Sequence, residues 1–275
     1  MWTLSGFADE IDPDLAVQCA VLRQLSIGFI EFRSAWDVNV LDLTDQQVTD
    51  ARRILTEHDL SVSSIGSPIG KINIEDDFEA HLRRMDRAVA VANALGAPFI
   101  RVFSFFLTTD QRPEDHRDEV VRRMSALADK AIAGGVVLLH ENEKEIFGDI
   151  PERVHDIVTS VNSPALRLAW DAANYVQCGV VPFPEAYGQL RPYTDYIQIK
   201  DAVLATAEVV PAGEGDGRIR ETVRALADDG FDGFFSMEPH LAAAHHLGGF
   251  SGPENFIRAT KAFTGILDAE AIPYR

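Results

Sequence analysis

The stretch VVLLHEN, residues 136–142, decides the fold class, because it joins a β-strand composition to a carboxylate at the strand's end. Aliphatic side chains, half of them β-branched, favour an extended strand, and Glu141 follows them where a loop would begin. Comparable apolar runs end at Asp171, Gln198 and Glu238. The chain therefore repeats one unit, an apolar strand that ends in a polar side chain.

Eight such runs alternate with segments of helical periodicity. The expected strands are Trp2–Ala8, Ile27–Arg33, Val62–Gly66, Phe99–Phe105, Val136–Asn142, Leu166–Asp171, Tyr196–Lys200 and Gly233–Glu238. The expected helices are about Pro13–Leu25, Thr44–His58 with Thr44 as N-cap, Asp77–Leu95, Pro113–Ala133, Pro151–Val161, Phe183–Leu190, Arg218–Asp228 and Pro253–Leu267. This alternation, without a low-complexity linker, predicts an α/β protein: a (β/α)₈ TIM barrel, formed by residues 1–275 as a single domain. An open doubly wound sheet is disfavoured, because no Gly-rich phosphate loop follows the first strand.

Charge and hydropathy limit the partners and the location. The 25 basic and 43 acidic side chains give a net charge of −18, which repels nucleic acids and anionic membranes. No apolar run is long enough to span a bilayer, and Asp9, Glu10 and Asp12 are unlike the basic start of a signal peptide. The sequence predicts a cytoplasmic protein without nucleic-acid or membrane partners, and leaves a homo-oligomer or a partner subunit open.

Charged side chains are expected inside the barrel. Successive strand residues face opposite sides, so Glu31 and Arg33 share the face opposite Ile30 and Phe32. Apolar residues must lie under the outer helices, so the charged face points inward. The same reasoning places these residues inside: Arg101, Glu141, Glu143, Asp171, Gln198, Lys200 and Glu238. Buried charges must neutralise each other or a ligand, and active sites of such barrels lie at the C-terminal strand ends.

Four of these strand ends offer oxygen ligands to one cation, and they are Glu141, Asp171, Gln198 and Glu238. Oxygen donors favour a hard divalent metal, Mn²⁺ first, with Mg²⁺, Co²⁺ and Zn²⁺ as alternatives. Asp171 has the alternative role of capping the next helical turn. Gln198 has the alternative of hydrogen-bonding neighbouring carboxylates.

The chemistry implied is proton transfer next to a carbonyl. A divalent cation can hold the carbonyl and adjacent hydroxyl of a sugar and stabilise the enediolate that forms when the α-proton leaves. Glu141 and Glu238, expected on opposite sides of the barrel mouth, can remove a proton from one face of a carbon and return it on the other. This predicts a sugar isomerase or epimerase with these two catalytic residues.

Several motifs in order resemble one superfamily. They are Leu139-His140-Glu141-Asn142, Asp171 with Asn174, Ile199-Lys200-Asp201, Gly213-Glu214-Gly215-Asp216, and Gly233 to Pro239. Together they are similar to the sugar phosphate isomerase/epimerase, or xylose isomerase-like, TIM barrel superfamily, over essentially the whole chain. The resemblance implies that Glu141, Asp171 and Glu238 hold a metal, and that the two glutamates also act as acid and base.

Two positions depart from that pattern. Gln198 stands where most relatives have a metal-binding histidine, and Asn174 where ketose epimerases often have a substrate-binding histidine. Two other functions therefore stay open. One is a metal-dependent lyase acting by β-elimination on 3-keto-glycosides, with His140 and Glu143 as base and acid. The other is a non-catalytic barrel that binds metal or sugar.

The candidate substrate-binding residues are His140, Glu143, Asn174, Lys200, His240, Lys71 and Arg101. Lys200 and Arg101 are favoured as partners that neutralise the interior acids. Residues 242–249, with His245 and His246, are expected to form a mobile loop, with a lid as the alternative. His81 is expected to be solvated on its helix. The substrate is expected to be a small carbohydrate, a free sugar or glycoside rather than a sugar phosphate.

Overall fold

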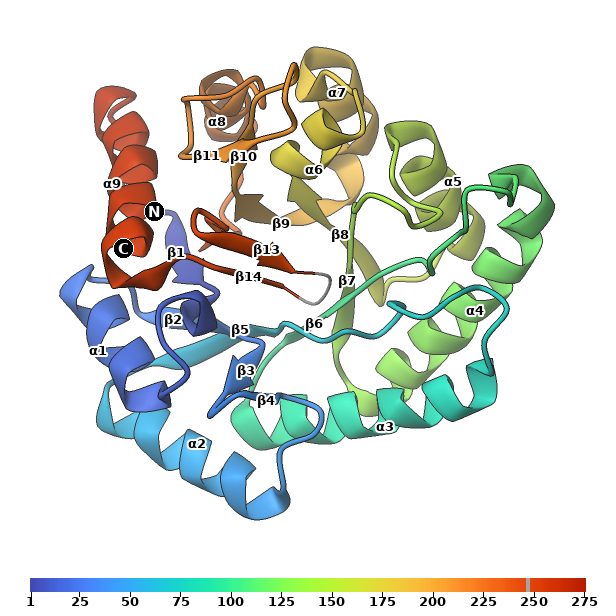
Figure 1. The fold of residues 1–275 in the computed structure, drawn as a ribbon, viewed down its shortest axis with the longest axis horizontal. Helices are drawn as coiled ribbons and strands as arrows, with labels where there is room; N and C mark the ends of the chain where they lie inside the picture. Colours follow the sequence, from blue (N-terminus) through green and yellow to red (C-terminus); the bar gives the residue numbers. More distant parts are fainter. Residues whose placement is uncertain (246–247) are drawn as a thin grey trace.

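Eight parallel strands form one sheet in the part of the chain that the computed structural model describes, residues 1–245 and 248–275. Their order is β1-β12-β9-β8-β7-β6-β5-β2. The two ends of this order, β1 and β2, also lie in contact, so the sheet closes into a barrel (Figure 1). The strands are β1 (Thr3–Gly6), β2 (Phe29–Phe32), β5 (Ser61–Ile65), β6 (Phe99–Val102), β7 (Val137–Glu141), β8 (Leu166–Asp171), β9 (Thr194–Ile199) and β12 (Phe234–Met237). The predicted (β/α)₈ barrel is confirmed.

Helices surround the barrel (Figure 1). They are α1 (Leu15–Gln24), α2 (Asp45–Glu57), α3 (Phe78–Leu95), α4 (Pro113–Gly134), α5 (Pro151–Val161), α6 (Ala172–Gln177), α7 (Tyr187–Leu190), α8 (Ile219–Asp228) and α9 (Gly252–Ala269). Thr44 caps α2 as predicted, since its side chain accepts a hydrogen bond from the Gln47 backbone N–H while the Gln47 side chain accepts one from the Thr44 backbone. Within the described ranges, no helix combines the length and the apolar content needed to cross a bilayer.

The chain between β8 and β9 differs from the prediction. Helix α6 follows β8 directly and was not expected. The helix predicted to begin at Phe183 is instead a π-helical turn, η2 (Pro182–Ala186), followed by α7 from Tyr187. Phe183 has the extended angles φ −126° and ψ 138°, because the residue before a proline is pushed out of the helical region. Pro184 therefore delays the regular helix.

In the described part of the chain, three loops that follow the C-terminal ends of barrel strands contain short β-hairpins. They are β3 (Ser34–Ala35) with β4 (Val38–Asn39), β10 (Asp201–Ala202) with β11 (Val209–Val210), and β13 (Ala243–His245) with β14 (Gly248–Phe250). The loop expected over 242–249 contains this hairpin, in which Ala243 pairs with Phe250 in an antiparallel ladder. The mobility expected of the loop stays a prediction. In Figure 1 this last hairpin lies across the barrel mouth. His246 lies outside the described residues.

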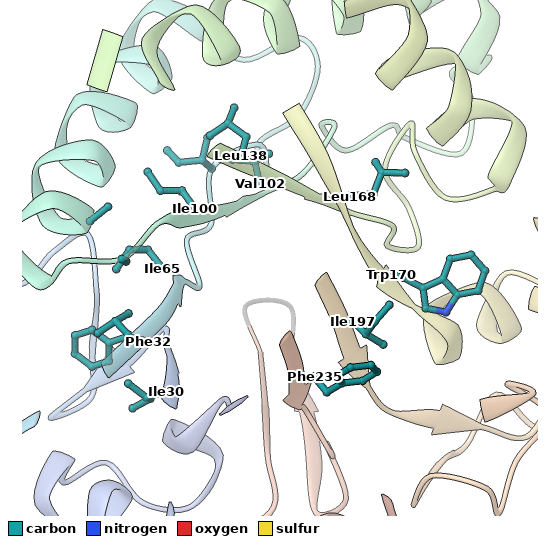
Figure 2. Close-up of a cluster of buried hydrophobic side chains, with 14 of the residues drawn as sticks. Ile30, Phe32, Ile65, Ile100, Val102, Leu138, Leu168, Trp170, Ile197 and Phe235 are labelled. Atoms are coloured by element: carbon teal, nitrogen blue, oxygen red, sulfur yellow. The ribbon is translucent and has the colours of Figure 1, made fainter. Parts of the chain in front are cut away.

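The barrel strands obey the predicted alternation. Apolar side chains such as Ile100, Leu138 and Trp170 point from the strands toward the helices (Figure 2). The opposite face fills the barrel in layers. The lowest layer is apolar and contains Phe99, Leu139, Ala169, Tyr196 and Phe234. The charged residues lie toward the C-terminal strand ends, above this packed base.

Hydroxyl groups separate the apolar layer from the charged one. The Ser63 hydroxyl lies 2.6 Å from the Ser5 hydroxyl and 2.9 Å from the Tyr196 hydroxyl. Glu31 is also buried here, and burial raises the pKa of Glu31 to about 7, with the Arg101 charge opposing the shift. The hydroxyl groups and Glu31 therefore lie between the apolar layer and the charged residues at the C-terminal strand ends.

His81 on α3 is buried, contrary to the expectation of a solvated histidine, with 7% exposure. Its Nε2 accepts a hydrogen bond of 2.7 Å from the Gly70 backbone N–H. Gly70 has φ +91°, and a Cβ there would lie 2.0 Å from the Phe103 carbonyl oxygen, so only glycine fits this turn. His81 thus fixes the loop that carries Lys71 to the barrel mouth.

The His81 contact predicts a pH-dependent stability. Burial, with the Arg84 and Arg123 charges, lowers the pKa of His81 from 6.5 to about 4. The unfolded chain takes up this proton below about pH 6.5 but the folded chain does not, so the stabilisation is complete above pH 6.5 and is lost as the pH falls toward 4. His81→Gln keeps an acceptor that does not titrate. Urea unfolding between pH 7 and 4.5 should show a steeper loss of unfolding free energy in the wild type than in the variant; parallel profiles would contradict this.

Candidate metal centre and its cavity

Three carboxylates meet at the C-terminal ends of the strands. Glu141 ends β7, Asp171 ends β8, and Glu238 follows β12. One oxygen from each lies within 4.8 Å of the others, and all three residues are buried. Because the strands are parallel and in register, their carboxyl ends reach the same edge of the barrel. The structure brings together the acids that the sequence placed in one site.

Gln198 completes the predicted donor set. It pairs with Asp171 on one side and with Ser236 on the other, and it is fully buried. Neither its amide oxygen nor its amide nitrogen has a hydrogen bond. The alternative role predicted for Gln198, hydrogen bonding to neighbouring carboxylates, is not seen in this structure. An unpaired buried amide is costly, and its oxygen is free to act as a ligand.

Asp171 and Asn174 organise the start of α6. The Asp171 Oδ1 atom accepts the Asn174 backbone N–H at 2.9 Å, so the predicted capping role is present for this oxygen. The Asp171 Oδ2 atom faces the cluster. The Asn174 side chain donates to Glu141 Oε1 at 3.1 Å and to the Asn142 carbonyl at 2.8 Å. Asn174, predicted to bind substrate, therefore also orients Glu141.

Cations neutralise the cluster. Lys200 Nζ lies 2.9 Å from Asp171 Oδ2 and 3.1 Å from Glu238 Oε2. Arg101 Nη1 lies 3.1 Å from Glu141 Oε2 and 3.5 Å from Glu238 Oε1. Arg33, which follows β2, contributes Nη1 at 3.1 Å from Glu238 Oε1 and Nε at 2.7 Å from Asp9 Oδ2. These contacts agree with the neutralising role favoured for Lys200 and Arg101.

Glu10 is a site residue that sequence reasoning missed. It is fully buried in η1 (Ala8–Glu10), after β1. Its Oε2 accepts the His240 backbone N–H at 2.8 Å and the Ser251 hydroxyl at 2.7 Å, and its Oε1 lies 3.2 Å from His240 Nε2. The signal was present, because Asp9 and Glu10 follow an apolar run as the other site acids do. Glu10 anchors the segment that carries His240 over the mouth.

A cavity of about 50 Å³, lined largely by polar residues, lies beside the cluster. It is lined by Lys71, Phe106, Glu143, Lys144, Glu145, Asn174, Gln177, Lys200, Val209 and His240. Most of the predicted substrate-binding residues are among them. Arg101 is not among them, and neither are the four predicted metal ligands; Arg101 lies beside Glu141. Lys71 Nζ lies 3.4 Å from Glu143 Oε2 across the cavity wall.

His140 does not reach the cavity. Strand alternation turns it away from Glu141, and a Cβ on Gly148 would lie 2.5 Å from its Cε1 atom, so it packs under the Gly148 backbone. Both ring nitrogens are buried without a hydrogen bond, and burial lowers the pKa of His140 to about 3. This position does not fit the predicted substrate contact, nor the base role in the lyase alternative.

The pKa values of Glu141 and Glu238 are shifted in opposite directions. Burial raises the pKa of Glu141 to about 8, and the Arg101 charge offsets this only in part. Burial also acts to raise the pKa of Glu238, but the charges of Lys200, His240 and Arg101 outweigh it and hold that pKa well below its usual value. Neighbouring carboxylates whose pKa values are pushed apart are suited to acid and base roles.

The donor set fits a hard divalent cation. It consists of carboxylate oxygens from three strands and one unpaired amide oxygen, with no sulfur. The fold and the site together define a barrel with an oxygen-rich centre at its mouth.

Comparison with known proteins places the chain in a family. Residues 19–258 match the model of the family described as xylose isomerase-like TIM barrel. The chain therefore belongs to this family. It is similar to a curated relative, the 2-epi-5-epi-valiolone 7-phosphate 2-epimerase of Actinoplanes sp. SE50/110, with 34% identity over 143 residues. That match covers 51% of this chain and 50% of the relative, so it spans about half the relative's length.

Solved structures share the fold over nearly the whole chain. A D-tagatose 3-epimerase-like protein superposes with a TM-score of 0.77 at 13% identity, covering 97% of each chain. A xylose isomerase-like TIM barrel protein from Mycobacterium smegmatis, in complex with magnesium, has a TM-score of 0.69 at 21% identity, again covering 97% of each chain. At these identities the likeness shows the fold alone.

The Glu141 pKa predicts pH-dependent metal binding. A carboxylate must lose its proton to act as a ligand, and the pKa of Glu141 is about 8 in the metal-free chain. Mn²⁺ affinity measured by calorimetry should therefore tighten by about tenfold per pH unit from pH 6 toward 8. Glu141→Gln cannot ionise and should bind more weakly with a flatter pH profile. Equal slopes in the two proteins would exclude Glu141 as the titrating ligand.

Proposed function

We propose that this protein is a divalent-metal-dependent isomerase or epimerase of a small carbohydrate. The observation that carries the proposal is the convergence of Glu141, Asp171 and Glu238 near the unpaired Gln198 amide. Their contact partners Lys200 and Asn174 line the adjoining cavity. These four residues would hold the metal, with Mn²⁺ favoured, and a bound cation would supply positive charge beside a substrate carbonyl.

Glu141 and Glu238 would carry the proton transfers. Glu238, whose pKa is lowered, is ionised and suited to take the proton from the carbon next to the carbonyl. Glu141, which ends β7, would be the group that returns a proton to the substrate. They stand on β7 and next to β12, so they approach a substrate from different sides. Return of the proton to the opposite face of the same carbon is epimerisation, and its transfer to the neighbouring carbon is isomerisation.

The cavity wall would position the substrate. Glu143 and Asn174 offer an acceptor and a donor for sugar hydroxyls, and Lys71 and His240 add polar contacts from two other loops. The Phe103 ring lies under the Lys71 ammonium at 4.3 Å, which holds that side chain at the wall. Such a mixed polar lining suits a hydroxyl-rich substrate. Similarity to the Actinoplanes epimerase adds 2-epi-5-epi-valiolone 7-phosphate to the compounds worth testing.

The lyase alternative is less well supported. It relied on His140 as base, and His140 packs under Gly148 outside the cavity. Glu143 does line the cavity, so β-elimination would need a different base beside it. The isomerase or epimerase reaction needs only the two glutamates that the cluster already contains.

The proposal predicts loss of turnover on removal of either glutamate charge. Glu141→Gln and Glu238→Gln should each abolish proton exchange, because the acid or the base is missing, while circular dichroism shows an intact barrel. Lys261→Met, on the exposed side of α9, serves as a control for a charge change away from the site. Normal activity in either glutamate variant would refute the assignment.

The reaction itself can be read by NMR in D₂O. The Mn²⁺-loaded protein would be incubated with ketoses, their phosphates, 2-epi-5-epi-valiolone 7-phosphate and 3-keto-glycosides. The metal would then be removed from each reaction mixture with a chelator before the spectra are recorded. We expect deuterium at a carbon next to the carbonyl with the carbon skeleton retained. Release of the aglycone from a 3-keto-glycoside would instead identify a lyase. Absence of exchange across the panel, with metal binding intact, would favour a non-catalytic binding protein.

A further inference from the structure

The oxygens of the three cluster carboxylates, Glu141, Asp171 and Glu238, all have protein partners, and Lys200 contacts two of them. Glu141 Oε1 accepts from Asn174, and its Oε2 pairs with Arg101. Asp171 Oδ1 caps α6, and Glu238 Oε1 pairs with Arg33. The two oxygens that none of these partners contacts are Asp171 Oδ2 and Glu238 Oε2. Lys200 Nζ contacts both, at 2.9 Å and 3.1 Å.

We propose that Lys200 is an internal counter-ion that competes with the metal for these two oxygens and is displaced into the cavity when the site is loaded. The proposal rests on the metal site inferred above. It goes further by assigning Lys200 a second position, in which its ammonium faces the substrate.

Lys200 is the cation of the cluster that is built to move. The Arg101 guanidinium lies between the Phe7 and Phe103 rings, with its carbon 4.7 Å and 4.9 Å from their centroids. The Arg33 guanidinium lies 4.5 Å from the Phe7 centroid and is also bonded to Asp9. Planar guanidinium groups held in this way have fixed positions, whereas a lysine ends in a compact ammonium on a flexible four-carbon stem.

The cavity offers Lys200 a place to go. Its side chain already borders the cavity, although it is only 3% exposed. Glu143 lines the same cavity with a carboxylate that is 17% exposed and already lies 3.4 Å from Lys71 Nζ, so Lys200 would share this carboxylate with Lys71. Asn174 offers an amide oxygen beside it. The ammonium can therefore exchange one set of oxygen partners for another without crossing an apolar barrier.

Displacement would couple metal loading to substrate recognition. While Lys200 pairs with Asp171 and Glu238, two of its three donor hydrogens are directed to the cluster. Once released, they are available to an oxygen-rich or anionic group of the substrate. We therefore infer that the metal-free protein lacks a substrate contact that the loaded protein has.

The first test measures Mn²⁺ affinity by calorimetry for the wild type, Lys200→Met and Lys144→Met. Lys144 borders the same cavity, and its ammonium lies 3.4 Å from Gln177 Oε1, away from the cluster. Lys144→Met therefore makes the same change in charge without freeing a ligand oxygen. Removal of Lys200 should tighten binding by about tenfold or more relative to the wild type, and removal of Lys144 should change it by less than about threefold. An equal effect of the two substitutions would overturn the proposal.

The second test needs no substitution and so does not depend on the folding of a variant. Wild-type protein, with and without Mn²⁺, would be briefly acetylated with an amine-reactive ester and the modified lysines quantified by mass spectrometry. Lys200 should be protected without metal and several-fold more reactive with it, while Lys261, exposed on α9, stays constant as the reference. Unchanged protection of Lys200 in protein that has bound Mn²⁺ would overturn the displacement and leave the metal site standing. Failure of both the wild type and Lys200→Met to bind Mn²⁺ would instead refute the metal site itself.

Discussion

Neutralisation of buried charge at the barrel mouth is the constraint on which the rest of this structure depends. Glu141, Asp171 and Glu238 are almost without contact with solvent, and a buried carboxylate is tolerated only beside cations or hydrogen-bond donors. Those partners come from other strands, with Arg101 on β6 and Lys200 just after β9. The ionic cluster therefore forms only when the barrel has closed, and its balance of charge decides what ligand the mouth can accept.

Carboxylates form the centre of the site and also hold the surrounding loops in place by accepting hydrogen bonds from them. Glu10 binds the segment that carries His240 and Ser251. Asp201 accepts the backbone N–H groups of Gly213, Gly215 and Gly217, which fixes the loop that follows β11. Glu141, Asp171 and Glu238 remain directed at one another. A chain of such strong negative charge thus uses part of that charge to build the rim of its site.

The alternation of apolar and polar residues predicted most of the barrel and most of the cluster, because strand periodicity alone decides which side chains share a face. It failed where a distant segment sets the environment. His81 lies at helical spacing from Phe78 and Met85 on the buried face of α3, but the hydrogen bond that its ring accepts comes from the distant Gly70 loop. The start of α7 was misplaced because Pro184 imposes an extended conformation on Phe183. Glu10 was not predicted as a site residue, because Asp9, Glu10 and Asp12 were considered only as acidic residues near the N-terminus and not as the end of the first strand.

The sequence by itself determined the order of strands and helices, the inward face of each strand and the oxygen-rich donor set, since these follow from local periodicity and composition. Only the tertiary structure decided which cation meets which carboxylate. It also decided that the Gln198 amide stays unpaired, that His140 is excluded from the cavity, and that Lys200 takes the last two oxygens of the cluster. The physical reason is that these contacts depend on the register between neighbouring strands and on loops from opposite ends of the chain, and neither is encoded within a single stretch of residues.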